Sequence, residues 1–207
     1  MENPKNLIIV IFGASGDLTF RMLMPAICSL RTQKLMPEKY AILGVGRTKI
    51  STEDFRIKMC ESIVTCSEEK VSDQKIISAF AQDLYYLSMD NSSESSYSEL
   101  KSLLLEIDNK YSIGGNYIFY MATPPSMYEV IAINLAKAGL SNQENGFRRV
   151  IIEKPFGYDL ESGRRLNKTS FEIISEEQIF SIEHYLWKEI VQILLVTWFA
   201  IGMFETL

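Results

Sequence analysis

The chain has 207 residues, of which 47% are hydrophobic and 23% are charged, and its formal net charge is −5. This size and composition suit one globular domain with a small remainder and exclude an intrinsically disordered chain. The acidic balance argues against a nucleic-acid partner, because binding to a phosphate backbone needs a basic face. A phosphorylated small molecule is not excluded, since one local basic cluster is enough to bind it.

The cysteines and the histidine indicate the compartment and argue against a metal site. The three cysteines match no zinc-binding spacing, and the sequence has a single histidine. We therefore expect free thiols in a reducing cytoplasm and no bound metal. The amino terminus carries no signal-peptide pattern, which agrees with a cytoplasmic location.

Apolar runs of strand length alternate with helical patterns along the chain. The runs expected to form strands cover 7–12, 40–45, 84–87, 116–121, 149–153 and 178–183. Helices are expected over 19–34, from 51 onward, and over 67–82, 96–109, 126–138 and 160–174. This alternation predicts βαβ units with right-handed crossovers, and therefore a Rossmann-like, doubly wound α/β fold with a parallel sheet.

The segment 190–204 is apolar apart from Gln192, Thr197 and Gly202. It is shorter than the ~20 residues that span a bilayer, so the sequence favours a buried or partner-facing helix over a membrane anchor. Exposed apolar surface on such a helix predicts self-association into a homo-oligomer.

Two glycines separated by two residues follow the first predicted strand. Gly13 and Gly16 lie between a buried strand and a helix, where glycines allow positive φ and let backbone N–H groups approach a phosphate. Ser15 offers a hydroxyl to the same phosphate. A tight turn without a ligand is the alternative, because the pattern is not the full G-x-G-x-x-G fingerprint.

The end of the second predicted strand decides between NAD and NADP. An acidic residue at this place bonds the ribose 2′-hydroxyl of NAD, whereas an arginine accommodates the 2′-phosphate of NADP. The strand ends at Arg47, Lys49 follows, and the next acidic residue is Glu53. We therefore predict NADP as the cofactor, with an exposed arginine on a solvated loop as the alternative.

Later strand ends carry further candidates, because open α/β sheets bind ligands beyond the carboxyl ends of their strands. Tyr128 lies on the first turn of the helix after the fourth strand, where it either covers a nicotinamide or packs as a core aromatic. Lys154 precedes a proline that holds it extended, and it either contacts a substrate oxygen or is a surface lysine in a turn. Donors that suit a phosphate monoester come from His184, Tyr185 and Lys188, although spacing alone favours a structural histidine.

The motifs together resemble the glucose-6-phosphate dehydrogenase family over nearly the whole chain. The matching segments are 13–18, 46–47, 119–125, 152–157 and 183–189. The resemblance implies an NADP-binding Rossmann-like domain over 1–182 and a short piece of a second, α+β substrate domain over 183–207. The activity that it implies is NADP-dependent oxidation of glucose 6-phosphate at C1 to a lactone, the first step of the oxidative pentose phosphate pathway.

The resemblance also implies roles for individual residues. Those assigned to the cofactor are Gly13, Ala14, Ser15, Gly16, Asp17, Leu18, Arg47, Asp90, Thr123, Tyr128 and Lys154. Those assigned to the substrate are Lys154, His184, Tyr185 and Lys188. Glu183 takes the place of the family's aspartate, the carboxylate that orients the general base.

Three departures from the family pattern bear on catalysis. The family's general-base histidine lies beyond the position of His184, and this chain has no second histidine. Trp187 replaces a glycine, and Met22 replaces a substrate-facing lysine. These departures weaken the case for substrate binding more than the case for NADP. An inactive NADP-binding module or a degenerate fragment is therefore the alternative function.

Overall fold

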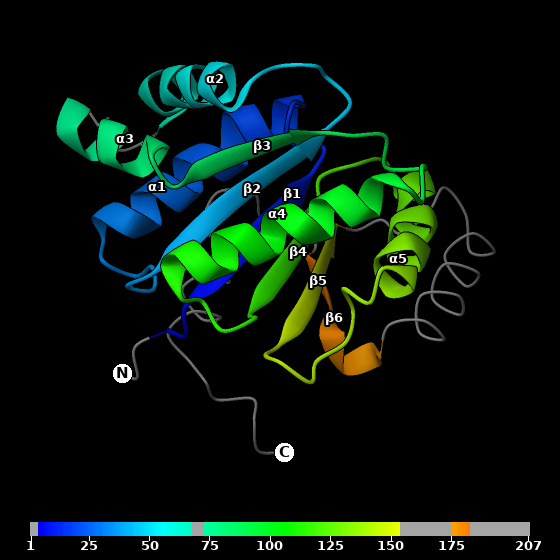
Figure 1. The fold of residues 1–207 in the computed structure, drawn as a ribbon. Coiled ribbons are helices and arrows are strands. Elements are labelled where there is room, and N and C mark those ends of the chain that lie inside the picture. The colour runs from blue at the N-terminus through cyan, green and yellow to red at the C-terminus, as the bar shows by residue number, and fades with distance from the viewer. Residues whose placement is uncertain (1–3, 68–72, 154–174, 183–207) are drawn as a thin grey trace.

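The computed structural model describes residues 4–67, 73–153 and 175–182. Within these ranges the chain forms three layers, with helices on both faces of one sheet (Figure 1). The helix predicted over 160–174, the apolar segment 190–204 and the domain boundary at 182/183 fall on or beside residues outside this description, and they stay predictions.

All six strands run parallel in the order β3-β2-β1-β4-β5-β6. Their bounds are β1 Leu7–Phe12, β2 Tyr40–Gly46, β3 Leu84–Ser88, β4 Tyr117–Met121, β5 Arg148–Glu153 and β6 Ile179–Ile182. The chain runs outward from β1 to β3, returns to the other side of β1 at β4, and runs outward again to β6. This order is that of doubly wound α/β folds and confirms the predicted parallel sheet.

Two groups of helices cover the sheet, one on each face (Figure 1). The first group is the π turn η1 Thr19–Leu23, α1 Met24–Thr32, α2 Thr52–Cys66 and α3 Gln74–Ala81. The second group is α4 Ser96–Tyr111 and α5 Tyr128–Lys137. Two short 3-10 turns, η2 Pro125–Met127 and η3 Glu176–Gln178, precede α5 and β6.

The central strand explains why its sequence is apolar without alternation. Ile9 and Ile11 of β1 pack under the first group of helices, whereas Val10 and Phe12 pack under the second. Every residue of β1 is buried. A parallel strand covered on both faces needs apolar side chains at successive positions, as the sequence predicted.

The helix predicted after the glycine loop contains a π turn in its first part, in which the Met24 N–H donates to the Thr19 carbonyl five residues earlier. Pro25 explains the widening, because it has no N–H and its ring crowds the preceding turn. The carbonyl of Phe20 is left without a helical donor. The buried hydroxyl of Ser62 in α2 donates to that carbonyl instead.

The helix predicted over 67–82 is shorter in the structure. The helix α2 extends to Cys66, Ser67 has an extended backbone, and α3 begins only at Gln74. Asp73 defines this start, because its side chain accepts a hydrogen bond of 2.8 Å from the Lys75 N–H. An aspartate is a favoured helix N-cap, so the signal was present in the sequence.

Candidate cofactor site at the carboxyl end of the sheet

The carboxyl ends of β1 and β4 lie side by side where the strand order reverses. Phe12 and Met121 are partners in the register of this pair, and Phe12 is the partner of Val45 on the other side. The chain leaves the sheet in opposite directions on either side of this point, and open α/β sheets bind their ligands outside the strand ends at such a switch point. The sequence-predicted residues that lie at this edge are 13–18, Arg47, Asp90 and Thr123.

Gly13 makes the first turn of the glycine loop and has a φ of +86°. A Cβ at this position would lie 2.2 Å from the carbonyl oxygen of Ala122, at the end of β4. The N–H groups of Gly13 and Ala14 both donate to the Val45 carbonyl, at 2.9 and 3.0 Å. The loop is therefore held between the ends of β2 and β4, and only glycine fits its first position.

The loop leads directly into the start of a helix. The Gly16 N–H donates to the Gly13 carbonyl at 2.9 Å, and the first helical bond runs from the Phe20 N–H to the Gly16 carbonyl at 3.2 Å. The N–H groups of Asp17 and Leu18 therefore precede the helical bonds and have no helical acceptor. They lie at the positive end of the helix, where a phosphate is stabilised.

Side chains around this helix start differ in exposure. Gly16 and Asp17 are exposed, Ala14 is buried, and Leu18 is half-buried against the core. The Asp17 carboxylate forms an exposed ion pair of 2.9 Å with the Arg21 guanidinium. The outer surface of the loop therefore consists of backbone groups and one ion pair.

Arg47 follows β2 directly and is exposed. Its neighbour Thr48 donates its hydroxyl to Ser15 Oγ at 3.0 Å, so the loop after β2 contacts the glycine loop. The Tyr86 phenol donates to the Thr48 carbonyl at 2.9 Å. Burial raises the pKa of this phenol, and hydrogen bonds with Ser15 and Thr48 partly offset that rise. Neither Thr48 nor Tyr86 carries a local sequence pattern that marks it as a site residue.

Asp90 follows β3 and is exposed, and its carboxylate is engaged within its own loop. The Ser92 hydroxyl and N–H both donate to Asp90 Oδ1, at 2.7 and 2.9 Å. These bonds lower the pKa of Asp90, and the nearby Arg47 charge lowers it further. Arg47 itself makes no ion pair within the described ranges.

Thr123 and Tyr128 lie beyond the end of β4. Thr123 places its Oγ1 in a buried position where the described chain offers no hydrogen-bond partner. Tyr128, the first residue of α5, is only 4% exposed and packs in the core on the face of the sheet that α4 and α5 cover. Burial, together with the nearby Glu153 charge, raises the pKa of this phenol to about 12. Of the two interpretations of Tyr128, this placement corresponds to the packed aromatic.

The residues predicted to contact the substrate lie in parts of the chain that the structure does not describe. Lys154, Glu183, His184, Tyr185 and Lys188 lie outside the described residues, so their roles stay predictions. Described residues contain no cluster of histidine, cysteine, aspartate and glutamate side chains that could hold a metal ion. No helix in the described ranges is both long enough and apolar enough to cross a membrane.

The strand order, the glycine loop and the helix start define a doubly wound dinucleotide-binding domain. Residues 10–193 match the family described as glucose-6-phosphate dehydrogenase, NAD binding domain. The chain belongs to the glucose-6-phosphate dehydrogenase family, through its amino-terminal, NAD-binding domain.

Similar proteins agree with this assignment. The chain is 42% identical over 198 residues to glucose-6-phosphate 1-dehydrogenase of Treponema pallidum, which covers 96% of this chain and 38% of that protein. It is 39% identical over 206 residues to the Bacillus subtilis enzyme of the same name, covering 100% of this chain and 40% of that protein. A structure of glucose-6-phosphate dehydrogenase in complex with glucose-6-phosphate superposes with a TM-score of 0.80 at 32% identity, over 97% of this chain and 41% of that one. The chain thus spans about two fifths of the length of these relatives.

Proposed function

We propose that this chain binds NADP in preference to NAD, with the pyrophosphate on the loop 13–18 and the 2′-phosphate at Arg47. The observation that carries the proposal is the place of Arg47. It is an exposed guanidinium next to the glycine loop and has no ion-pair partner among the described residues. A guanidinium offers planar, bidentate donors that match a phosphate, and it keeps its charge at every physiological pH.

The first two acidic residues after Arg47 in the sequence, and Asp90 beside it, make hydrogen bonds or ion pairs with other residues, which supports the preference for a phosphate. The Asp54 carboxylate accepts hydrogen bonds from the Ser51 hydroxyl and N–H at the start of α2. Glu53 forms an ion pair of 3.5 Å with Arg56. The Asp90 carboxylate is held by Ser92. We expect none of the three to accept a hydrogen bond from a ribose 2′-hydroxyl, as an acidic residue after β2 would in an NAD site.

Titration calorimetry with NADP and with NAD tests the proposal on the wild-type chain and on Arg47→Ala. A charge-assisted hydrogen bond contributes about 1.5–3 kcal/mol, so Arg47→Ala should weaken NADP binding by roughly 10- to 150-fold and leave NAD binding nearly unchanged. Lys39→Ala is the control, because it removes the same charge from an exposed residue at the opposite end of β2. Equal affinities of the wild-type chain for NADP and NAD would overturn the proposal.

Oxidation of glucose 6-phosphate is the second candidate function, favoured by 42% identity to an enzyme of that name across 96% of this chain. The resemblance assigns the only histidine, His184, to the substrate phosphate, which leaves no histidine as general base. A proton acceptor within reach of the C1 hydroxyl is needed for hydride transfer. We therefore propose that these 207 residues bind NADP without turnover, and NADPH formation from NADP and glucose 6-phosphate would contradict this.

A further inference from the structure

We infer that Tyr86 is a positioning residue that holds the Arg47 loop in the form that recognises a 2′-phosphate, and so sets the preference for NADP over NAD. The Arg47 loop is the segment 47–51, between the end of β2 and the start of α2. The inference rests on the proposed NADP binding and extends it to a residue of the neighbouring strand β3.

The phenol of Tyr86 holds the first half of the Arg47 loop. Its hydroxyl donates to the Thr48 carbonyl at 2.9 Å, and the side chain is 7% exposed. The ring lies 4.9 Å from the ring of Phe55, centroid to centroid. A Cβ on Gly46 would lie 2.8 Å from the phenol oxygen, so glycine at the end of β2 makes room for this contact.

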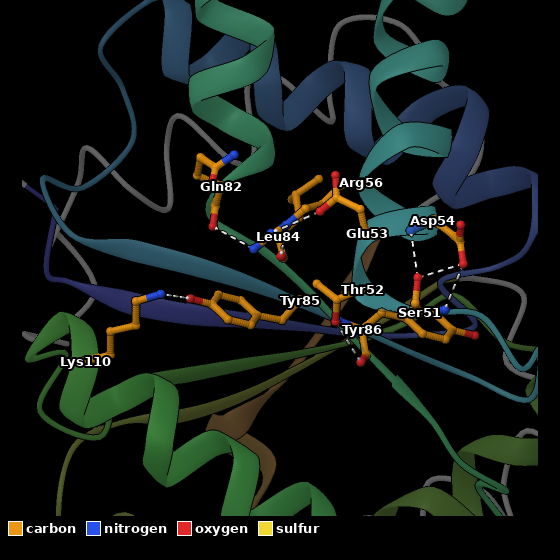
Figure 2. A network of polar contacts seen from close by, with 10 residues as sticks. All are labelled: Ser51, Thr52, Glu53, Asp54, Arg56, Gln82, Leu84, Tyr85, Tyr86 and Lys110. Carbon is orange, nitrogen blue, oxygen red and sulfur yellow. Dashed lines mark hydrogen bonds and ion pairs between the residues drawn. The ribbon is translucent and has the colours of Figure 1, made fainter.

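The backbone of Tyr86 holds the other end of the same loop. The Tyr86 N–H donates to Thr52 Oγ1 at 3.3 Å, and the Thr52 hydroxyl lies 3.4 Å from the Tyr86 carbonyl (Figure 2). Thr52 is the first residue of α2, and Ser51 before it closes a capping box with Asp54 (Figure 2). One residue of β3 therefore binds the chain at both ends of the Arg47 loop.

These contacts fix the backbone beside Arg47 and leave its side chain to the ligand. Thr48 bonds to Ser15 through its hydroxyl and to Tyr86 through its carbonyl, so it links the glycine loop to β3. A loop that is ordered before binding does not lose that freedom when the ligand arrives. Without the phenol hydroxyl, ordering part of the loop would cost affinity for NADP. NAD has no 2′-phosphate for Arg47 and would not incur this cost.

The fold itself does not depend on this hydroxyl. The strand β3 pairs with β2 over five residues, from Leu84 to Ser88. Arg56 of α2 also donates to the outer edge of β3, from Nε to the Leu84 carbonyl at 3.0 Å and from Nη2 to the Gln82 carbonyl at 3.2 Å (Figure 2). Tyr86→Phe keeps the ring, the strand pairing and these edge contacts, so we expect a folded variant.

The experiment compares Tyr86→Phe with Tyr85→Phe, which removes the same atom from the adjacent residue. The Tyr85 hydroxyl accepts from Lys110 at 2.6 Å and lies 3.2 Å from that of Tyr111, away from the Arg47 loop. In calorimetric titration, Tyr86→Phe should bind NADP about three- to tenfold more weakly than the wild type and should bind NAD equally well. This loss corresponds to the entropic cost of ordering one residue or less. Tyr85→Phe should keep the wild-type ratio. Equal losses for NADP and NAD, or an unchanged ratio in Tyr86→Phe, would overturn the inference.

A second measurement separates positioning from a general effect on the fold. In the background of Arg47→Ala, Tyr86→Phe should have no further effect on NADP affinity, because the phenol acts through Arg47. If the two substitutions instead lower NADP affinity additively in the double variant, the phenol does not act through Arg47. The two proposals would be contradicted by different results. A wild-type chain that binds NADP and NAD equally would overturn both the proposed function and this inference. If the wild type prefers NADP and Tyr86→Phe keeps the same preference, only this inference is overturned.

Discussion

The two ends of the sheet are built from similar turns, but they differ in what satisfies the turn N–H groups. At the amino end, Gly114 and Gly115 have positive φ, as Gly13 does at the carboxyl end. The Asp108 carboxylate accepts from both of the amino-end glycines, at 3.0 and 2.8 Å, and from the Tyr117 phenol at 2.8 Å. A protein carboxylate thus occupies the place that a ligand phosphate would take at the other end.

The comparison shows what distinguishes a binding turn from a structural one. The Asn116 side chain continues the internal bonding at the amino end, accepting from the Phe147 N–H at 3.1 Å and donating to the Asn6 carbonyl at 3.0 Å. At the carboxyl end, the N–H groups at the helix start and the Arg47 guanidinium have no such acceptor among the described residues. Glycine and turn geometry are common to both ends. The N–H groups of Gly114 and Gly115 have a carboxylate acceptor, whereas the N–H groups at the helix start after Gly13 have no acceptor among the described residues.

The largest change in the free energy of unfolding is expected from a substitution in the turn at the amino end. In Gly115→Ala, the new Cβ would lie 1.8 Å from the Asn145 carbonyl oxygen at a φ of +81°. Left-handed strain of about 1–2 kcal/mol and overpacking of about 1–3 kcal/mol should together lower the free energy of unfolding by about 3 kcal/mol. Urea denaturation measures this loss.

The adjacent glycine is the matched control for this prediction. Gly114 has nearly the same φ, +80°, but a Cβ there would meet nothing within 4 Å. Gly114→Ala should therefore lose only the strain of about 1–2 kcal/mol. Similar losses in the two variants would show that close packing of the backbone at the amino end contributes little.

A smaller loss of stability is expected behind the glycine loop, where Ser62 donates to the carbonyl of Phe20. Ser62→Ala leaves this carbonyl buried without a donor, so the free energy of unfolding should fall by about 1–3 kcal/mol. The control is Ser102→Ala, which removes an exposed hydroxyl that donates to the Ser98 carbonyl four residues earlier in α4. That variant should change stability by less than about 0.5 kcal/mol.

Pro25 supplies a sharper form of the same test. Pro25→Ala restores an N–H and allows an α-helical turn, in which the Met24 N–H donates to Phe20. Ser62→Ala should then cost less in the Pro25→Ala background than in the wild type. An undiminished cost in that background would show that Ser62 acts independently of the π turn.

Local patterns predicted the sheet and the glycine loop, and contacts between distant segments account for what they missed. Gly13 and Arg47 could be identified because each follows a recognisable strand. Tyr86 looked like an ordinary strand residue, since its phenol meets Thr48 at a separation of 38 positions in the sequence. The Phe20 carbonyl in the π turn likewise accepts from a donor 42 positions away.

Tyr128 shows how the exact start of a helix affects the direction of a side chain. The predicted helix over 126–138 places this residue within the first turn and leaves its direction open. In the structure, a 3-10 turn over Pro125–Met127 comes first, and α5 begins at Tyr128 with its side chain packed in the core. The direction of the side chain follows from the turn type and from the available core space, and neither can be obtained from periodicity alone.

The smallest expected effect on stability is at the carboxyl end itself. A Cβ on Gly16 would meet only the Gly13 carbonyl oxygen, at 3.1 Å, and the position is exposed. Gly16→Ala should therefore change the free energy of unfolding by less than about 1 kcal/mol, because reduced freedom of the unfolded chain offsets the close contact. Cofactor affinity should fall nonetheless, since the methyl group would lie where the proposed site brings backbone N–H groups to the pyrophosphate.

The pattern of that loss in calorimetric titration identifies which part of the cofactor the glycine loop contacts. NADP and NAD share the pyrophosphate, so Gly16→Ala should weaken both by about tenfold, whereas Arg47→Ala should weaken NADP alone. Loss of NADP affinity alone in Gly16→Ala would place the 2′-phosphate, rather than the pyrophosphate, on this loop. Unchanged affinity for both cofactors would make the loop a strand-to-helix turn without a ligand. Its unpaired N–H groups would then face solvent, and the carboxyl end would be structural in the same sense as the amino end.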